Sequence, residues 1–110
     1  MSEVVIRGLS ASPGIARGKV TIIKDAKDVN KAVETDIEIL VSSFVSPSLS
    51  QLIKKAKAIV LEKGGITTHV AVLAREFGIP CVVGAKNATS VLKDGDIVIV
   101  DASKGVVKRE

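Results

Sequence analysis

The sequence has little of the residue types that mark secreted, metal-binding or nucleic-acid-binding proteins. It contains one Cys, one His and two Phe, and it has neither Trp nor Tyr. One Cys cannot form an internal disulfide, and one Cys with one His cannot complete a zinc site, so we expect no bound metal. The shortage of aromatic rings argues against a nucleic-acid partner, because proteins that bind single strands stack bases on such rings.

The apolar run of a signal peptide or of a membrane-spanning helix is also missing. The N-terminus, "MSEVVIRGLS", has no apolar core, and no segment approaches the roughly 20 apolar residues that cross a bilayer. The net charge is +4, with Lys and Arg spread along the chain, which indicates a solvated surface rather than a dedicated basic patch. We therefore expect a cytoplasmic protein with neither a membrane nor a nucleic-acid partner.

The sequence is rich in Val, Ile, Leu and Ala, which make up most of its 46% apolar content. Its 110 residues are enough for one compact domain, residues 1–110, with its own core. Apolar or alternating runs that end at Gly, Pro or charged residues predict strands at residues 3–8, 19–24, 37–43, 58–62, 80–84, 96–101 and 105–110. The last two should form a hairpin.

Helical spacing of apolar residues predicts a helix over residues 47–57 and a short helical turn within residues 87–95. Residues 25–36 form either a short helix or a surface loop. Residues 9–18 are expected to be a loop with a tight turn at Pro13-Gly14. The strand–helix–strand passages predict right-handed crossovers that lay the helices on a sheet, and therefore a mixed α/β fold.

The only histidine lies where a glycine-containing loop meets a predicted helix, in "GGITTHVAVLAREFGIPCVVG", residues 64–84. Thr67 or Thr68 is suited to begin the helix and Gly78 to end it, with Pro80 blocking its continuation. One face of this helix should be buried, because apolar residues recur at helical spacing along it: Val70, Leu73, Ala74 and Phe77.

A histidine in the first turn of a helix lies beside unpaired backbone N–H groups and the positive end of the helix dipole. Gly64 and Gly65 allow further N–H groups to approach an anion, because no Cβ stands in the way. The positive potential favours a neutral imidazole at His69, and such a ring can attack a phosphoryl group. These local features also fit a surface histidine that only bonds near the cap, so both interpretations stay open at this point.

Residues 64–84 closely resemble the signature of the phosphohistidine domain, also called the mobile or swivelling domain, of phosphoenolpyruvate-utilising enzymes. That family includes phosphoenolpyruvate synthase, pyruvate phosphate dikinase and enzyme I of the sugar phosphotransferase system. Similarity extends over nearly the whole chain, through "ASPGIARG", "AIVLEKGG" and "LKDGDIVIVDASKGVV". The signature positions that match are Gly64, Gly65, Thr67, His69, Ala74, Arg75, Gly78, Ile79, Pro80 and Gly84.

The resemblance implies a swivelling β/β/α domain that acts as a phosphoryl carrier. His69 would be phosphorylated transiently, and Gly64, Gly65, Thr67 and Thr68 would cradle the phosphate or orient the ring. The reaction would transfer a phosphoryl group between a nucleotide and pyruvate or phosphoenolpyruvate. The chain would be the carrier component of such a phosphotransferase and not active alone. It would bind no cofactor, while partner subunits or domains would bind the nucleotide, phosphoenolpyruvate and magnesium.

The resemblance has departures and alternatives. Thr68 stands where Ser or Cys is commoner, and Ala102 where Gly is usual, which predicts a different turn in the closing hairpin. Thr67 occupies a position that is phosphorylated for regulation in some dikinases. A non-catalytic interaction or regulatory module that keeps the fold is the alternative function, and a piece of a larger enzyme fits the span almost equally well.

Four further side chains in or near the signature are expected to have no catalytic role. Arg75 lies about 240° around the helix from His69, so it should pair with backbone or a carboxylate rather than with phosphate. Glu62 and Lys63 are expected to be solvated loop charges, and Cys81 a small core residue without chemistry.

Overall fold

A computed structural model describes residues 3–43 and 46–110 of the chain. Within these residues, eight strands form one sheet in the order β1-β8-β7-β3-β4-β5-β6-β2. The strands are β1 (Glu3–Arg7), β2 (Leu9–Ser12), β3 (Ile15–Ile23), β4 (Ile39–Ser42), β5 (Ala58–Leu61), β6 (Cys81–Val83), β7 (Ile97–Asp101) and β8 (Val106–Arg109). The helices are α1 (Ala26–Ala32), α2 (Ser50–Ile53), α3 (His69–Phe77) and α4 (Ala88–Val91), with a 3₁₀ helix at Pro47–Leu49.

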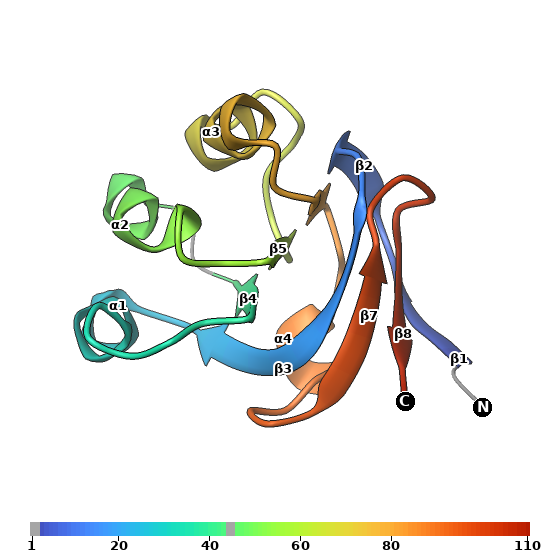
Figure 1. Cartoon of the computed structure of the whole chain (residues 1–110), viewed down its shortest axis with the longest axis horizontal. Coiled ribbons are helices and arrows are strands. Elements are labelled where there is room, and N and C mark those ends of the chain that lie inside the picture. The colour runs from blue at the N-terminus through green and yellow to red at the C-terminus, as the bar shows by residue number, and fades with distance from the viewer. Residues whose placement is uncertain (1–2, 44–45) are drawn as a thin grey trace.

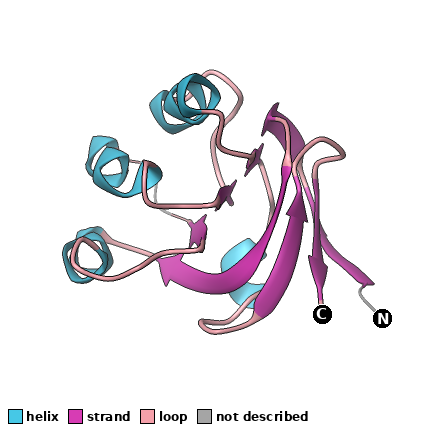
Figure 2. Ribbon diagram, in the orientation of Figure 1, coloured by secondary structure: helices cyan, strands magenta, loops and turns pink. Residues whose placement is uncertain are grey.

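The sheet has a parallel half and an antiparallel half that share β3. Strands β3, β4, β5 and β6 pair in parallel, and α1, α2 and α3 are the crossovers between them. Strands β3, β7, β8 and β1 pair antiparallel and curve away from the parallel half. Figure 1 shows α1, α2 and α3 on one side of the parallel strands and α4 on the other. Helices α1, α2 and α3, the parallel strands and the antiparallel strands thus form the three layers of the expected β/β/α fold (Figure 2).

The parallel strands are buried on both faces and separate two apolar cores. Because side chains alternate along a strand, Leu40 enters the core under the three crossover helices, whereas Val41 enters the core shared with α4 and the antiparallel strands. This explains why "AIVL" in β5 is apolar throughout and buried at every position. The first core packs Val29, Leu52, Ile53, Val70 and Ala74 from the helices, and the second packs Ala88, Leu92, Val98, Val100 and Val107.

The two edges of the sheet are joined at Gly8, which links β1 to β2. Strand β1 pairs with β8 and β2 pairs with β6, and the Gly8 N–H donates to the Gly105 carbonyl at 2.8 Å. A Cβ on Gly8 would lie 2.5 Å from the Val83 carbonyl oxygen, and one on Gly105 would lie 2.5 Å from the Gly8 carbonyl oxygen. The backbones cross too closely here for any side chain.

Several local predictions differ from the structure. Residues 9–18 hold β2 and the start of β3. The tight turn predicted at Pro13-Gly14 is wrong, because the chain does not bend sharply at these two residues. Gly14 instead bonds to the closing hairpin: its N–H donates to Ser103 Oγ at 3.0 Å, and its carbonyl accepts from Ala102 at 2.8 Å. Of the two alternatives at residues 25–36, the helix is found, capped by Asp25.

The helix predicted over residues 47–57 is shorter than expected. A 3₁₀ turn at Pro47–Leu49 precedes α2, which ends at Ile53. The N–H groups of Lys55 and Ala56 then bond to carbonyls three residues back, so the chain tightens before β5 begins. Leu49, Leu52 and Ile53 are fully buried, as the apolar spacing predicted.

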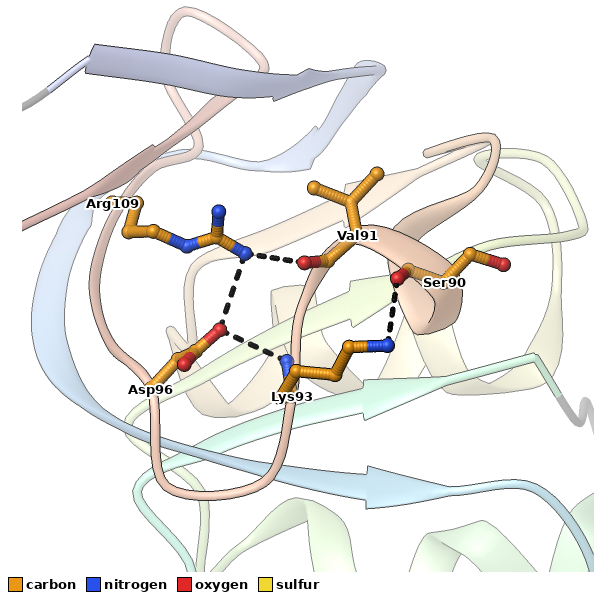
Figure 3. Close-up of polar contacts among 5 residues, drawn as sticks. All are labelled: Ser90, Val91, Lys93, Asp96 and Arg109. Atoms are coloured by element: carbon orange, nitrogen blue, oxygen red, sulfur yellow. Dashed lines mark hydrogen bonds and ion pairs between the residues drawn. The ribbon is translucent and has the colours of Figure 1, made fainter.

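Arg109 ties the C-terminal strand to the end of α4 (Figure 3). Its Nη2 donates to the Val91 carbonyl and lies 3.2 Å from Asp96 Oδ2. The same Asp96 oxygen accepts from the Lys93 N–H at 2.9 Å, and Lys93 Nζ donates to the Ser90 carbonyl at 3.1 Å. These bonds close the last turn of α4 and hold the following loop against β8.

Replacing Arg109 with methionine should lower the free energy of unfolding by about 1–2 kcal/mol, because the Val91 carbonyl and Asp96 lose a charged donor that is only partly exposed. Urea unfolding followed by circular dichroism measures this. Lys108→Met is the matched control, since the Lys108 side chain forms no hydrogen bond or ion pair within residues 3–43 and 46–110. Equal losses in the two variants would contradict the assignment.

Candidate functional site

His69 is exposed and is the first residue of α3. The loop of residues 62–68 leads to it from the carboxyl end of β5. In open α/β sheets, ligands bind outside the carboxyl ends of the parallel strands. The fold therefore places His69, the only histidine, at the carboxyl ends of the parallel strands, where a ligand is expected.

Thr68, one of the two alternatives, is the N-cap of α3. Its Oγ1 accepts from the Ala71 N–H at 3.4 Å and donates to the Gly65 carbonyl at 3.0 Å. The Thr68 N–H also donates to the Gly65 carbonyl, at 3.2 Å. Thr67 is exposed, and its hydroxyl has no hydrogen-bond partner in the described part of the chain. Thr68 therefore shapes the loop, while the Thr67 hydroxyl remains available to a ligand.

Several backbone N–H groups around His69 are unpaired. Within residues 3–43 and 46–110, no acceptor bonds to the N–H groups of Gly65, Ile66, Thr67, His69 or Val70. Those of His69 and Val70 lie in the first turn of α3, at the positive end of the helix dipole. Amides in such a group are suited to bind an anion.

The two loop glycines differ in backbone conformation and in surroundings. Gly64 has φ +89°, which favours glycine on backbone grounds. Gly65 does not have such a φ, and a Cβ placed on it would meet no atom of residues 3–43 and 46–110 within 4 Å. Neither backbone strain nor packing within the chain calls for glycine at position 65, but close approach of a ligand to the backbone would.

Arg75 is structural, as expected, and bonds to two carbonyls. Its Nη1 donates to Ala11 in β2 at 2.9 Å, and its Nη2 donates to Ile66 in the loop at 2.8 Å. Arg75 therefore joins three segments: its own helix, the edge strand and the loop before His69. At the other end of α3, Gly78 caps the helix with φ +67°, as predicted.

Glu62 is not the solvated loop charge that the sequence suggested. Its side chain is half-buried, and Oε2 accepts from the Thr89 hydroxyl at 2.6 Å. Thr89 lies in α4, on the opposite side of the parallel strands and 27 residues further along the chain. No local pattern could reveal this contact, which anchors the start of the His69 loop. Lys63 is exposed, as expected.

Cys81 is fully buried in β6, as expected of a core residue. Burial raises the pKa of its thiol to about 12, because the thiolate would be desolvated, and nearby Arg75 offsets this only in part. The thiol is therefore protonated at neutral pH and has little nucleophilic character.

This shift predicts a loss of stability at alkaline pH. The thiol of the unfolded chain ionises near pH 9, whereas that of the folded chain does not ionise until about pH 12. The stabilisation is therefore complete below pH 9 and falls by about 1.4 kcal/mol per pH unit above it. Urea unfolding between about pH 8 and 11 should show this slope in the difference between the wild type and Cys81→Ala. A difference that does not change with pH would contradict it.

Neither a metal cluster nor a membrane span is found in the described part of the chain. No three His, Cys, Asp or Glu side chains gather there in a way that could hold a metal ion. None of its helices is long and apolar enough to cross a bilayer.

Comparisons with known proteins agree with the geometry. Residues 34–105 match the family described as PEP-utilising enzyme, mobile domain. The chain is 49% identical over 105 residues to a probable phosphoenolpyruvate synthase of Archaeoglobus fulgidus and 48% identical over 106 residues to the phosphoenolpyruvate synthase of Pyrococcus furiosus. Each match covers 96% of this chain but only 14% and 13% of the respective relatives.

Solved structures show the same fold. An enzyme I structure determined in solution superposes with a TM-score of 0.73 at 18% identity, covering 94% of this chain and 92% of that one. The aconitase X structure of Thermococcus kodakaraensis superposes with a TM-score of 0.67 at 25% identity, covering 96% and 97%. With the family match, the close relatives and the exposed histidine in its glycine-containing loop, the chain belongs to the mobile-domain family of phosphoenolpyruvate-utilising enzymes.

Proposed function

We propose that this chain is a phosphoryl carrier in which His69 takes a phosphoryl group from one partner and gives it to another. The observation that carries the proposal is the position of His69, exposed at the start of α3 beside a loop whose N–H groups have no acceptor among the described residues. Gly64, Gly65, Thr67 and Thr68 form or shape this cradle. The partners would exchange the group between a nucleotide and pyruvate or phosphoenolpyruvate.

The transfer requires a neutral ring with an accessible nitrogen. The lone pair of that nitrogen, which we assign as Nε2, forms the N–P bond while the P–O bond to the donor breaks and the donor oxygen keeps the bonding pair. In the second half-reaction an acceptor oxygen attacks phosphorus and the N–P bonding pair returns to the ring. The cradle amides and the helix dipole stabilise the negative charge of the bound phosphate in both steps.

Magnesium and the two substrates belong to the partners in this proposal. In phosphoryl-transfer enzymes, metal ions hold and neutralise the donor phosphates. The described residues of this chain include no group of three His, Cys, Asp or Glu side chains that could bind such an ion. Most of the length of the phosphoenolpyruvate synthase relatives lies outside the match. Separate domains or subunits with those binding sites are therefore the partners that we propose.

A second function, a non-catalytic interaction or regulatory module, is the alternative to the carrier. The fold also occurs in a structure named aconitase X. A module of that kind would not need the cradle, and its stability and partner binding would not depend on His69. The phosphorylation experiment below separates the two functions.

The test is phosphorylation by labelled phosphoenolpyruvate, or by a nucleotide labelled on its transferred phosphate. Each labelled donor would be mixed with this chain and with the phosphoenolpyruvate-binding and nucleotide-binding domains of a relative. We expect label that is lost in acid and stable in alkali in the wild type, and none in His69→Ala. Label retained in His69→Ala, or absent from the wild type with both donors, would exclude the carrier. A urea unfolding curve of His69→Ala confirms that the variant is folded, which the exposure of this side chain predicts.

A further inference from the structure

We infer that Arg75 is a positioning residue, which fixes the direction in which the loop before His69 points its N–H groups. The inference rests on the proposed function, because the N–H groups matter only if an anion binds there. Arg75 lies six positions after His69, and its guanidinium donates a hydrogen bond to the loop before His69.

The geometry of one peptide unit carries the inference. Arg75 Nη2 holds the Ile66 carbonyl at 2.8 Å. The peptide bond between Ile66 and Thr67 is trans, so the Thr67 N–H points opposite to that carbonyl. Holding the carbonyl toward Arg75 therefore turns the Thr67 N–H away from it, and no acceptor in the described residues takes this N–H.

The neighbouring peptide unit is held in the same way by a different group. The Gly65 carbonyl accepts from both the hydroxyl and the N–H of Thr68. The Ile66 N–H, which belongs to that unit, therefore points in the opposite direction and is likewise unpaired among the described residues. Two successive peptide units thus have bonded carbonyls and unbonded N–H groups, one held by Thr68 and the other by Arg75.

The second hydrogen bond of Arg75 fixes the guanidinium, and with it the Ile66 carbonyl, relative to the sheet. Nη1 donates at 2.9 Å to the Ala11 carbonyl in β2, a strand that pairs with β6. The planar guanidinium thereby links the loop to the sheet through two donors of fixed spacing, which the single ammonium of a lysine cannot match. A charged donor on the Ile66 carbonyl also polarises that peptide unit and strengthens its N–H as a donor.

The experiment phosphorylates the chain chemically with phosphoramidate, so that no partner is needed. In this reaction the N–P bond to His69 forms as the P–N bond of phosphoramidate breaks and ammonia leaves. Intact-mass measurements under alkaline conditions give the rate, and proton–nitrogen NMR spectra follow the amides of Ile66 and Thr67. In the wild type, both amide protons should shift downfield when His69 is phosphorylated.

Arg75→Met should lose the Thr67 shift, keep the Ile66 shift and react about 10- to 100-fold more slowly, because the cradle is misplaced by roughly an ångström. Arg75→Lys keeps the charge but not the two bonds, and should lose most of the Thr67 shift as well. It also keeps the test valid if the methionine variant does not fold. Lys104→Met, which removes an exposed positive charge from the closing hairpin, should behave as the wild type.

The outcomes separate the two ideas. Wild-type chain that gains no phosphoryl group on His69 would overturn the proposed function. Phosphorylation of the wild type with equal rates and equal Thr67 shifts in Arg75→Met or Arg75→Lys would leave the carrier intact and overturn the role of Arg75. Equal loss of the Ile66 and Thr67 shifts would also overturn it, because that pattern indicates general loosening of the loop.

Discussion

Gly105→Ala is expected to lower the free energy of unfolding by about 2–5 kcal/mol, a large part of the 5–15 kcal/mol that stabilises a typical domain. The position has φ +70°, which costs an L-residue about 1–2 kcal/mol. A Cβ there would also lie 2.5 Å from the Gly8 carbonyl oxygen, so the backbone must shift, at about 1–3 kcal/mol more. The shift would disturb the join between β1 and β2 that connects the two edges of the sheet.

Gly78→Ala is the matched control for this prediction. Gly78 has nearly the same φ, +67°, but a Cβ there would meet no atom within 4 Å in the part of the chain that the structure describes. It should therefore cost only the 1–2 kcal/mol of the left-handed conformation. Urea unfolding of both variants measures the difference. If Gly105→Ala is no less stable than Gly78→Ala, the close approach of the two backbones is not what requires glycine.

Gly65→Ala is expected to do the reverse: to leave stability unchanged and to impair function. A methyl group at this position meets no atom of the described residues within 4 Å and is not opposed by the backbone conformation. The free energy of unfolding should therefore change by less than about 0.5 kcal/mol. The methyl group would occupy space that the proposed phosphate needs. We expect phosphorylation of His69 to slow by about 10- to 100-fold.

The rate of phosphoramidate labelling, measured beside a urea unfolding curve, tests this prediction. Lys63→Ala serves as a control in the same loop, because Lys63 is an exposed side chain and should affect neither quantity. A Gly65→Ala chain that is as stable and as reactive as the wild type would show that the loop does not bind the phosphoryl group through its backbone.

Local patterns predicted much of this fold from the sequence. The apolar runs of β4 and β5 and the closing hairpin of β7 and β8 lie close to the predicted ranges, because each run is short and ends at strong chain-breaking or charged residues. The caps of α3 at Thr68 and Gly78 follow from side-chain and backbone chemistry within a few residues. Such features depend on neighbours in the sequence.

Features that depend on distant residues could not be predicted. Strand β2 looks like a loop in "LSASPG" because its partner, β6, lies about 70 residues away. Glu62 looks solvated because nothing near it in sequence identifies Thr89 as its partner. The pairing of Arg75 with backbone was predicted, but its two carbonyls belong to separate segments, and only the folded chain brings them together.

Mass spectrometry of the chain, purified under alkaline conditions after exposure to its phosphoryl donor and digested, tests the central claim most directly. We predict one added phosphoryl group, located on the peptide that contains His69, removed by mild acid and absent from His69→Ala. A phosphoryl group found instead on Thr67 or another hydroxyl, stable in acid and still present in His69→Ala, would contradict the carrier.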